Sequence, residues 1–256
     1  TFVSEGGRTY VAWGWKGGGS ASSNSDGSIT SNVSVSTTAG FSIVSYAGNN
    51  TAGATVGHGL SQEPNIMIFK NRNNGSTSWC FYHSAKGTSG TGRLNTSDAF
   101  GDTAFITTTP SSSVFTLTAT TIVNENNMIA YCFAEKKGYS KFGSYTGNGN
   151  ADGPFVYTGF KPAFVITKTA SATYHWSTND NKRNTFNPVD KRLYPSQSAV
   201  EATSDSYDVD FLSNGFKIRS SSVSFNNSGD NVIYMAFAEN PFVGNDSGTA
   251  VPVTAG

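Results

Sequence analysis

The chain has 256 residues, and its seventeen basic and seventeen acidic side chains cancel, with charged residues at only 13% of the composition. With so few charged residues and no net charge, the sequence gives no sign of a basic surface that could bind a phosphate backbone or anionic lipid. No apolar run approaches the ~18 residues of a membrane-spanning helix. We therefore expect no nucleic acid and no membrane partner. The abundance of Gly, Ser, Thr, Asn and aromatic residues favours strands and turns.

Residues 1–36 are expected to lie before the first complete domain. The run Thr9–Gly17, which is apolar and aromatic, is interpreted as the closing strand of an upstream repeat, since the chain begins with Thr and resembles a piece of a longer one. Gly17–Ser28 has no residue able to anchor a core and is predicted to be a flexible connector. Ile29–Val35 alternates between apolar and polar residues, as an edge strand or arm would.

Short apolar segments bounded by Gly, Asn and Pro follow, and none has a sustained period of 3.6 residues. The segments expected as strands are Phe41–Tyr46, Ile66–Lys70, Ser78–His83, Ala104–Thr107, Val114–Thr118 and Asn127–Glu135. Several short strands with turns and no helix predict a β-sandwich or jelly roll.

The same order of segments then occurs a second time, at an offset of about 100 residues. Asn127–Glu135 returns as Asn231–Glu239, and Pro64–Lys70 returns as Pro162–Lys168. We predict an all-β chain of two tandem, jelly-roll-like β-sandwich domains related by duplication, each with its own core, at residues 37–140 and 141–244, followed by a tail at 245–256.

The apolar closing runs are typical of strands buried on both faces. The residues assigned to these repeat-core strands are Trp13, Trp15, Tyr131, Phe133, Met235 and Phe237.

No catalytic or metal-binding constellation is apparent in the sequence. Glu135 and Glu239 belong to different domains, whereas a glycosidase needs two carboxylates about 5 to 10 Å apart. His58, His83 and His175 each lack a second ligand at metal-binding spacing. We therefore predict a protein that is not an enzyme and uses no metal and no cofactor.

Two further features have a structural and a functional interpretation. The oxygen-rich segment Asn148–Asp152 suggests calcium, but a turn held by Asn and Asp side chains is favoured because no Glu follows at the twelfth position of an EF loop. Cys80 and Cys132 are interpreted as buried free thiols in preference to a bridge.

Four aromatic residues next to polar loops are candidates for stacking on sugar rings, as rigid amphipathic platforms, with core or inter-domain packing as the alternative. They are Tyr82, Tyr174, Trp176 and Tyr194.

Together these motifs resemble a repeated domain of unknown function that is common in structural proteins of marine bacteriophages. The segments that carry the resemblance are Thr9–Gly19, Ser23–Ser34, Gly40–Tyr46, Gly57–Leu60, Asp152–Phe160 and Tyr234–Phe242. The resemblance implies a virion surface component, such as a tail fibre, an adhesin or a capsid decoration protein, with other virion proteins as partners. It supplies no catalytic residues.

The leading hypothesis is a non-enzymatic protein of the virion surface, assembled in the host cytoplasm and homo-oligomeric, trimeric if it is fibre-like. Its Asn-, Ser- and Gly-rich loops would contact a host-surface glycan, as binding loops on rigid scaffolds do. A polysaccharide depolymerase or glycosidase module, and a carbohydrate-binding module of a secreted bacterial protein, are the alternatives.

Overall fold

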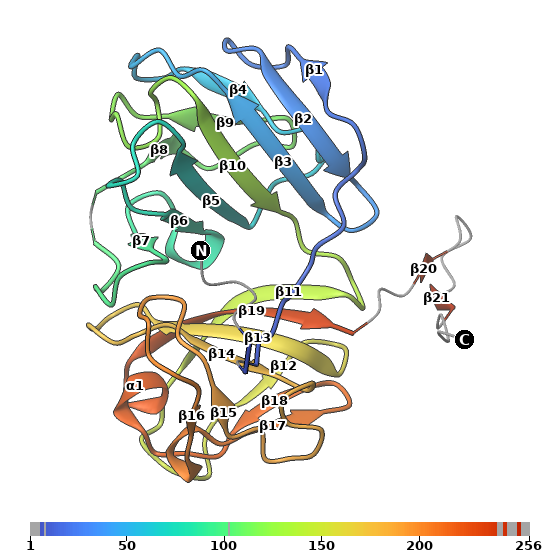
Figure 1. Ribbon diagram of the computed structural model, residues 1–256, viewed down its shortest axis with the longest axis vertical. Coiled ribbons are helices and arrows are strands. Elements are labelled where there is room, and N and C mark those ends of the chain that lie inside the picture. Colours follow the sequence, from blue (N-terminus) through green and yellow to red (C-terminus); the bar gives the residue numbers. More distant parts are fainter. Residues whose placement is uncertain (1–5, 8, 102, 240–242, 245–249, 252–256) are drawn as a thin grey trace.

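The computed structural model describes residues 6–7, 9–101, 103–239, 243–244 and 250–251. In these residues helix is limited to α1 (Val223–Asn226) and the 3-10 turns η1 (Ser84–Lys86) and η2 (Asp205–Tyr207). None of their helices is long and apolar enough to cross a membrane. The prediction of an all-β chain is confirmed, and the strands form two stacked units (Figure 1).

The first unit is a sandwich of two antiparallel sheets. Its large sheet has the order β1–β2–β3–β10–β5–β6–β7, formed by β1 (Ser22–Asn24), β2 (Ser31–Ser36), β3 (Phe41–Tyr46), β10 (Met128–Phe133), β5 (Ile66–Asn71), β6 (Cys80–His83) and β7 (Thr91–Arg93). Its small sheet has the order β4–β9–β8, formed by β4 (Thr55–Gly57), β9 (Val114–Leu117) and β8 (Ile106–Thr108). Apolar side chains from both sheets fill one core between them.

The second unit repeats the order of the four strands β3–β10–β5–β6 and of the small sheet, without counterparts of β1, β2 and β7 among the described residues of its large sheet. Its large sheet has the order β11–β19–β13–β14, formed by β11 (Ser140–Thr146), β19 (Asn231–Ala238), β13 (Pro162–Thr169) and β14 (Ser177–Asp180). Its small sheet has the order β12–β18–β17, formed by β12 (Phe155–Tyr157), β18 (Gly215–Ile218) and β17 (Val209–Leu212). Two-stranded pairs join β15 (Lys191–Arg192) with β16 (Ala202–Thr203) and β20 (Val243–Gly244) with β21 (Ala250–Val251).

Each unit has a buried asparagine at an equivalent position, and its side chain forms equivalent hydrogen bonds to the backbone of the same unit. The buried amide of Asn124 accepts a hydrogen bond from the backbone N–H of Asn49 and donates to the carbonyls of Thr51 and Thr118. Asn226 makes the matching bonds, with the N–H of Asn148 and the carbonyls of Asn150 and Ser220. This agreement supports the predicted duplication, although common ancestry of the two units stays a prediction.

The closing strand β19 is buried on both faces, as predicted, whereas Ile129 and Tyr131 on the second face of β10 are half-buried. Along β10, Met128, Ala130 and Cys132 contribute to the core of the first unit, whereas Tyr131 and Phe133 point to a second cluster. That cluster lies between the two large sheets, because β19 contributes Ile233, Met235 and Phe237 to it. Figure 1 shows β11 and β19 along the side of the second unit that faces the first. The other unit therefore contributes to covering the second face of each closing strand, while the ring of Tyr131 also stacks on Trp79 of its own unit.

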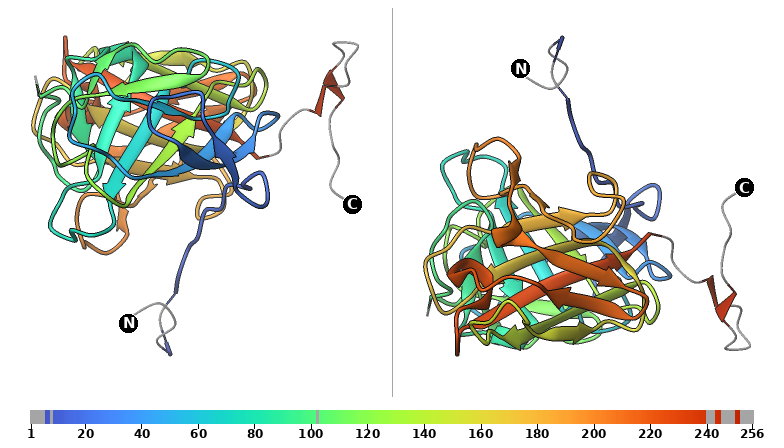
Figure 2. Two further views of the ribbon diagram at one scale, coloured as in Figure 1. Left: turned by 90° about the horizontal axis from the view of Figure 1, so that it is seen from above. Right: turned by 90° about the horizontal axis from the view of Figure 1, so that it is seen from below.

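The expected strand at Thr9–Gly17 is wrong, since residues 9 to 18 pair with no sheet. Trp15 instead places its ring 6.0 Å from that of Phe133 and 5.3 Å from that of Phe237, measured between centroids, and Trp13 lies 5.2 Å from Phe164. The segment thus contributes aromatic side chains, and no ladder of backbone hydrogen bonds, to the seam between the units. Gly14 and the glycines from Gly17 onward interrupt the run and disfavour a strand. Figure 2 shows the early part of this blue segment extending beyond the strands.

The predicted flexible connector is also wrong in its second half, because Ser22–Asn24 forms β1 and pairs with β2. After β1, the side chain of Asn24 accepts from the N–H of Asp26, and Ser28 exchanges two hydrogen bonds with Thr55. Backbone pairing and hydrogen bonds from short polar side chains hold this segment in place. The pattern of apolar residues in the sequence could not predict this. The first unit therefore begins at β1 and not at residue 37, while the predicted tail at 245–256 lies mostly outside the described residues.

Candidate functional site

Most polar residues singled out in the sequence have structural partners. Glu135 pairs with Lys141 at 2.6 Å and Glu239 pairs with Lys182. Side chains of Asn148 and Asn150 accept hydrogen bonds from the backbone two residues ahead, so the Asn148–Asp152 segment is a turn of the expected kind. Within the part of the chain that the structure describes, no three His, Cys, Asp or Glu residues are grouped so as to hold a metal ion.

Two of the histidines are buried and hydrogen-bonded to backbone on both ring nitrogens. His58 accepts from the N–H of Leu60 and contacts the carbonyl of Ser111, and His83 accepts from the N–H of Ala85 and contacts the carbonyl of Tyr234. Burial lowers the pKa of both imidazoles. They are neutral structural groups, and both ring nitrogens of each already have a backbone hydrogen-bond partner.

Cys80 and Cys132 are buried and free, as predicted, and burial raises the pKa of each thiol to about 12.

Two of the four aromatic candidates for sugar stacking are buried residues. Tyr82 lies in the core of the first unit, and Trp176 lies between the units, where its Nε1 donates to the carbonyl of Arg93 at 2.9 Å. The prediction that these two rings stack on a glycan is wrong, because both are fully buried.

The other two aromatic candidates, Tyr174 and Tyr194, meet at one open depression of about 300 Å³ on the second unit. We call it the Arg192 pocket; its principal lining residues are Tyr174, His175, Arg192, Tyr194, Tyr207 and Ser224. Ser97 of the first unit completes one side. None of the residues that line the pocket is acidic.

The loop that carries Tyr174 is held from below by a buried lysine. The Nζ atom of Lys168 donates to the carbonyls of Thr169 at 2.6 Å and Ala172 at 3.0 Å, and burial lowers the pKa of Lys168 to about 8. His175 Nδ1 lies 2.9 Å from Ser196 Oγ, which links this loop to the one that carries Tyr194. The walls of the pocket are therefore fixed by hydrogen bonds that do not involve a ligand.

Arg192, at the end of β15, is the central polar residue of the pocket and is only 3% exposed. Its guanidinium carbon lies 4.6 Å from the ring centroid of Tyr194, 4.5 Å from that of Tyr207 and 5.8 Å from that of Phe225. Its Nη1 donates to Ser224 Oγ at 3.2 Å, and its buried Nε has no partner in the described residues. Cation–π contacts of this kind stabilise a desolvated cation but use none of its N–H donors.

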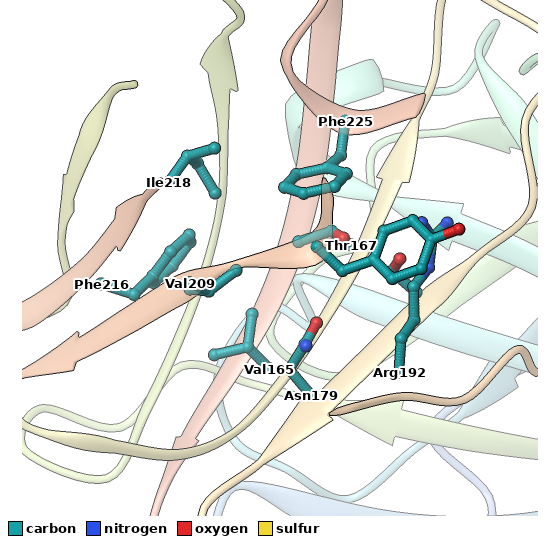
Figure 3. A pocket seen from close by; sticks show the side chains of 10 residues that line it. Val165, Thr167, Asn179, Arg192, Val209, Phe216, Ile218 and Phe225 are labelled. Carbon is teal, nitrogen blue, oxygen red and sulfur yellow. The ribbon is translucent and has the colours of Figure 1, made fainter. Parts of the chain in front are cut away.

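Behind Arg192, a second and enclosed cavity of about 10 Å³ lies inside the core of the second unit. Figure 3 shows Arg192 at one end of this cavity and the apolar side chains of Phe216 and Ile218 at the other. Ser177, whose buried hydroxyl also lacks a partner, belongs to its lining. The volume and the two polar groups suit a single water molecule. Arg192 thus separates a small internal cavity from the open pocket.

In the first unit, Arg93 occupies the sequence position equivalent to that of Arg192, but its surroundings differ. The side chain of Arg93 is 36% exposed, and its Nη1 lies 3.9 Å from a carboxylate oxygen of Asp98. Asn95 stands where the second unit has Tyr194, and its side chain accepts from the backbone N–H of Trp79. The aromatic cage around the arginine is therefore confined to the second unit.

Sequence reasoning identified Tyr174 and Tyr194 but missed Arg192 and Tyr207. The pair Arg192-Leu193, which matches Arg93-Leu94, was the available signal, and it marks an equivalent position without distinguishing a surface arginine from a caged one. Tyr207 lies in η2, in a stretch with no strand pattern.

A family model described as a domain of unknown function, DUF7483, matches residues 2–241, which span both units and the segment that carries Trp15. No curated protein and no solved structure matches the chain. The chain therefore belongs to the DUF7483 family of domains of unknown function.

Proposed function

We propose that this chain is a non-enzymatic protein of the virion surface and that it contacts a host-surface glycan through the Arg192 pocket. The observation that carries the glycan contact is the meeting of two half-buried tyrosines, Tyr174 and Tyr194, at one polar-rimmed depression. The virion location rests on the sequence resemblance to structural proteins of marine bacteriophages, as part of a tail fibre, an adhesin or a capsid decoration, in contact with other virion proteins.

The pocket combines the two kinds of surface that a sugar presents. The faces of Tyr174 and Tyr194 can cover the apolar C–H face of a pyranose ring. Ser222, Ser224 and Gln197 supply short polar groups around the rim. A depression of about 300 Å³ lies at the lower end of the range for small-ligand sites, which suits a single sugar ring of a longer chain.

The scaffold beneath the pocket is suited to recognition by loops. Each unit has its own apolar core, and the cluster between the large sheets joins the units. Loops on such a scaffold can be held in one conformation, which lowers the entropic cost of binding.

A binding role is favoured over a depolymerase or glycosidase role. Hydrolysis of a glycosidic bond requires two carboxyl groups on either side of it. No Asp or Glu is among the residues that line the Arg192 pocket. A carbohydrate-binding module of a secreted bacterial protein remains the alternative for location, and it shares the glycan contact.

Two measurements test the proposal. Immunogold electron microscopy with an antibody against this chain should label purified phage particles, and unlabelled particles would refute the virion location. The purified chain should bind host-surface polysaccharide in a pull-down assay, and the double variant Tyr174→Ala/Tyr194→Ala should lose at least ~10-fold in affinity, since an aromatic anchor of a binding site typically contributes more than ~1 kcal/mol.

The matched control is Tyr157→Ala, which removes a tyrosine of β12 that is 63% exposed and does not line the pocket. Binding by this variant should equal that of the unchanged chain. An equal loss in both variants would show that the Arg192 pocket is not the contact surface.

A further inference from the structure

We propose that the Arg192 pocket selects a carboxylate-bearing sugar, whose carboxylate is bound by the caged guanidinium of Arg192. The inference rests on the proposed glycan contact and specifies its ligand class. It predicts that acidic polysaccharides, such as polyuronates, are preferred over neutral ones.

The first step is that Arg192 is a buried cation without an anionic partner. No carboxylate of the described residues lies within 4.0 Å of it, and Ser224 Oγ is the hydrogen-bond acceptor for its Nη1. Taking a guanidinium out of water is costly unless it is paired, so a site of this kind is set up for an anion.

Arg183 shows how the same unit treats an arginine with a structural role. Its side chain is 10% exposed, and its Nε and Nη1 pair with Asp180 at 2.6 Å and Glu201 at 3.1 Å. Arg192 is buried to a similar degree and lines an open depression, but has three aromatic rings in place of the two carboxylates. Arg192 therefore lacks the anionic partners that Arg183 has, and an anion from solvent can approach it through the open depression.

The geometry of the cage favours a planar carboxylate on a ring. The rings of Tyr194 and Tyr207 hold the guanidinium plane in place, and a fixed guanidinium presents its N–H groups as a fork that matches a carboxylate. Tyr174, on the loop held by Lys168, supplies a second aromatic face for the sugar ring. An inorganic anion would contact the guanidinium of Arg192 but would make no use of the aromatic face of Tyr174.

Asp98, which is next in sequence to a lining residue, does not compete for Arg192. Asp98 follows Ser97, which lines the pocket, but its carboxylate pairs with Arg93 of the first unit. The pocket therefore has one caged cation, hydroxyl groups and aromatic faces, with no acidic residue in its lining to repel a carboxylate.

Isothermal titration calorimetry on the full chain tests the inference with uronate and sialyl oligosaccharides and with the same compounds after reduction of their carboxyl groups. At least one acidic compound should bind ~10-fold or more tightly than its reduced form, since a hydrogen bond to a charged group typically contributes ~1.5–3 kcal/mol. Arg192→Met should remove this preference. Arg93→Met, the matched change in the first unit, should leave it intact.

Thermal melting would show whether Arg192→Met is folded. If it is not, Arg192→Lys keeps the charge but lacks the fork, and it should bind the acidic compound at least ~10-fold more weakly than the unchanged chain. Full affinity in Arg192→Lys, or a preference that survives Arg192→Met, would overturn the inference.

Other outcomes separate this inference from the proposed function. Equal binding of acidic and reduced compounds, lost in Tyr174→Ala/Tyr194→Ala, would overturn carboxylate selection and leave the glycan contact standing. Binding of inorganic sulfate or phosphate as tight as that of the acidic sugars would show an anion site without sugar selectivity and would also overturn it. Absence of binding to every acidic compound and to host polysaccharide would refute both.

Discussion

Protonation of His83 should weaken the contact between the two units. His83 ends β6 in the first unit and is fully buried, and its Nε2 lies 3.2 Å from the carbonyl oxygen of Tyr234 in β19 of the second unit. Its Nδ1 accepts from the backbone N–H of Ala85 at 3.1 Å, so the neutral ring donates from Nε2. A second proton has to be placed on Nδ1, where it would oppose the N–H group that already points at that atom.

The sign and size of the effect follow from the pKa. Burial lowers the pKa of His83 from 6.5 to about 4, against the raising effect of the bond to Tyr234 and together with the lowering effect of Lys86. As pH falls, the unfolded chain takes up the proton first, so the free energy of unfolding decreases between pH 6.5 and pH 4. At ~1.4 kcal/mol per pKa unit, the total loss is on the order of 3 kcal/mol, complete below pH 4.

Urea unfolding at pH 7, 6, 5 and 4.5 measures this loss, with His83→Gln as the matched variant. The Gln amide can still donate to the Tyr234 carbonyl, but it does not titrate in this range. The variant should be less stable than the unchanged chain at pH 7, and the difference between the two should shrink as the pH falls. His58 and the carboxylates titrate alike in both proteins. Parallel pH profiles would refute the assignment of the acid sensitivity to His83.

Three further predictions concern the scaffold. Asn124→Ala and Asn226→Ala should each lower the free energy of unfolding by ~2–4 kcal/mol, because each leaves several buried backbone groups unpaired; in urea unfolding, costs that differ by more than ~1 kcal/mol would contradict the equivalence of the two networks. Trp15→Ala should cost ~1–3 kcal/mol and increase hydrogen exchange in β10 and β19, because it opens the aromatic cluster between the units; unchanged exchange there would show that Trp15 does not close the seam. Cys80 and Cys132, whose pKa values burial raises to about 12, should not react with a thiol reagent at pH 8 in the folded chain, and rapid labelling would reveal frequent opening of the first core.

The strand predictions succeeded where side-chain pattern alone decides the structure. Phe41–Tyr46 is β3 with the predicted bounds, and Pro162–Lys168 and Asn231–Glu239 differ from β13 and β19 by a single residue at one end. These segments are β-branched and aromatic runs closed by Gly, Asn or Pro, so local chemistry and burial favour the same conformation.

The predictions failed where a segment depends on distant partners. Ser22–Asn24 forms a strand only because β2 offers a free edge, and nothing in its own side chains indicates this. Thr9–Gly17 has strand-like composition, yet its tryptophans pack between two units whose contact is set by residues far along the chain. Tyr82 and Trp176 lie next to polar loops in sequence, but the core of the first unit encloses Tyr82 and the cluster between the units encloses Trp176.

The sequence by itself determined the strand-rich class, the two-fold occurrence of one strand order and the presence of apolar side chains on both faces of β10 and β19, because these depend on composition and on periodicity within short segments. Tertiary structure decided what covers the second face of those strands and which polar residues meet. Arg93 and Arg192 occupy equivalent positions, yet one pairs with Asp98 at the surface and the other is enclosed by Tyr194, Tyr207 and Phe225. Loops from separate parts of the chain form that cage. The distances between these loops in the folded chain cannot be predicted from the number of residues that separate them in the sequence.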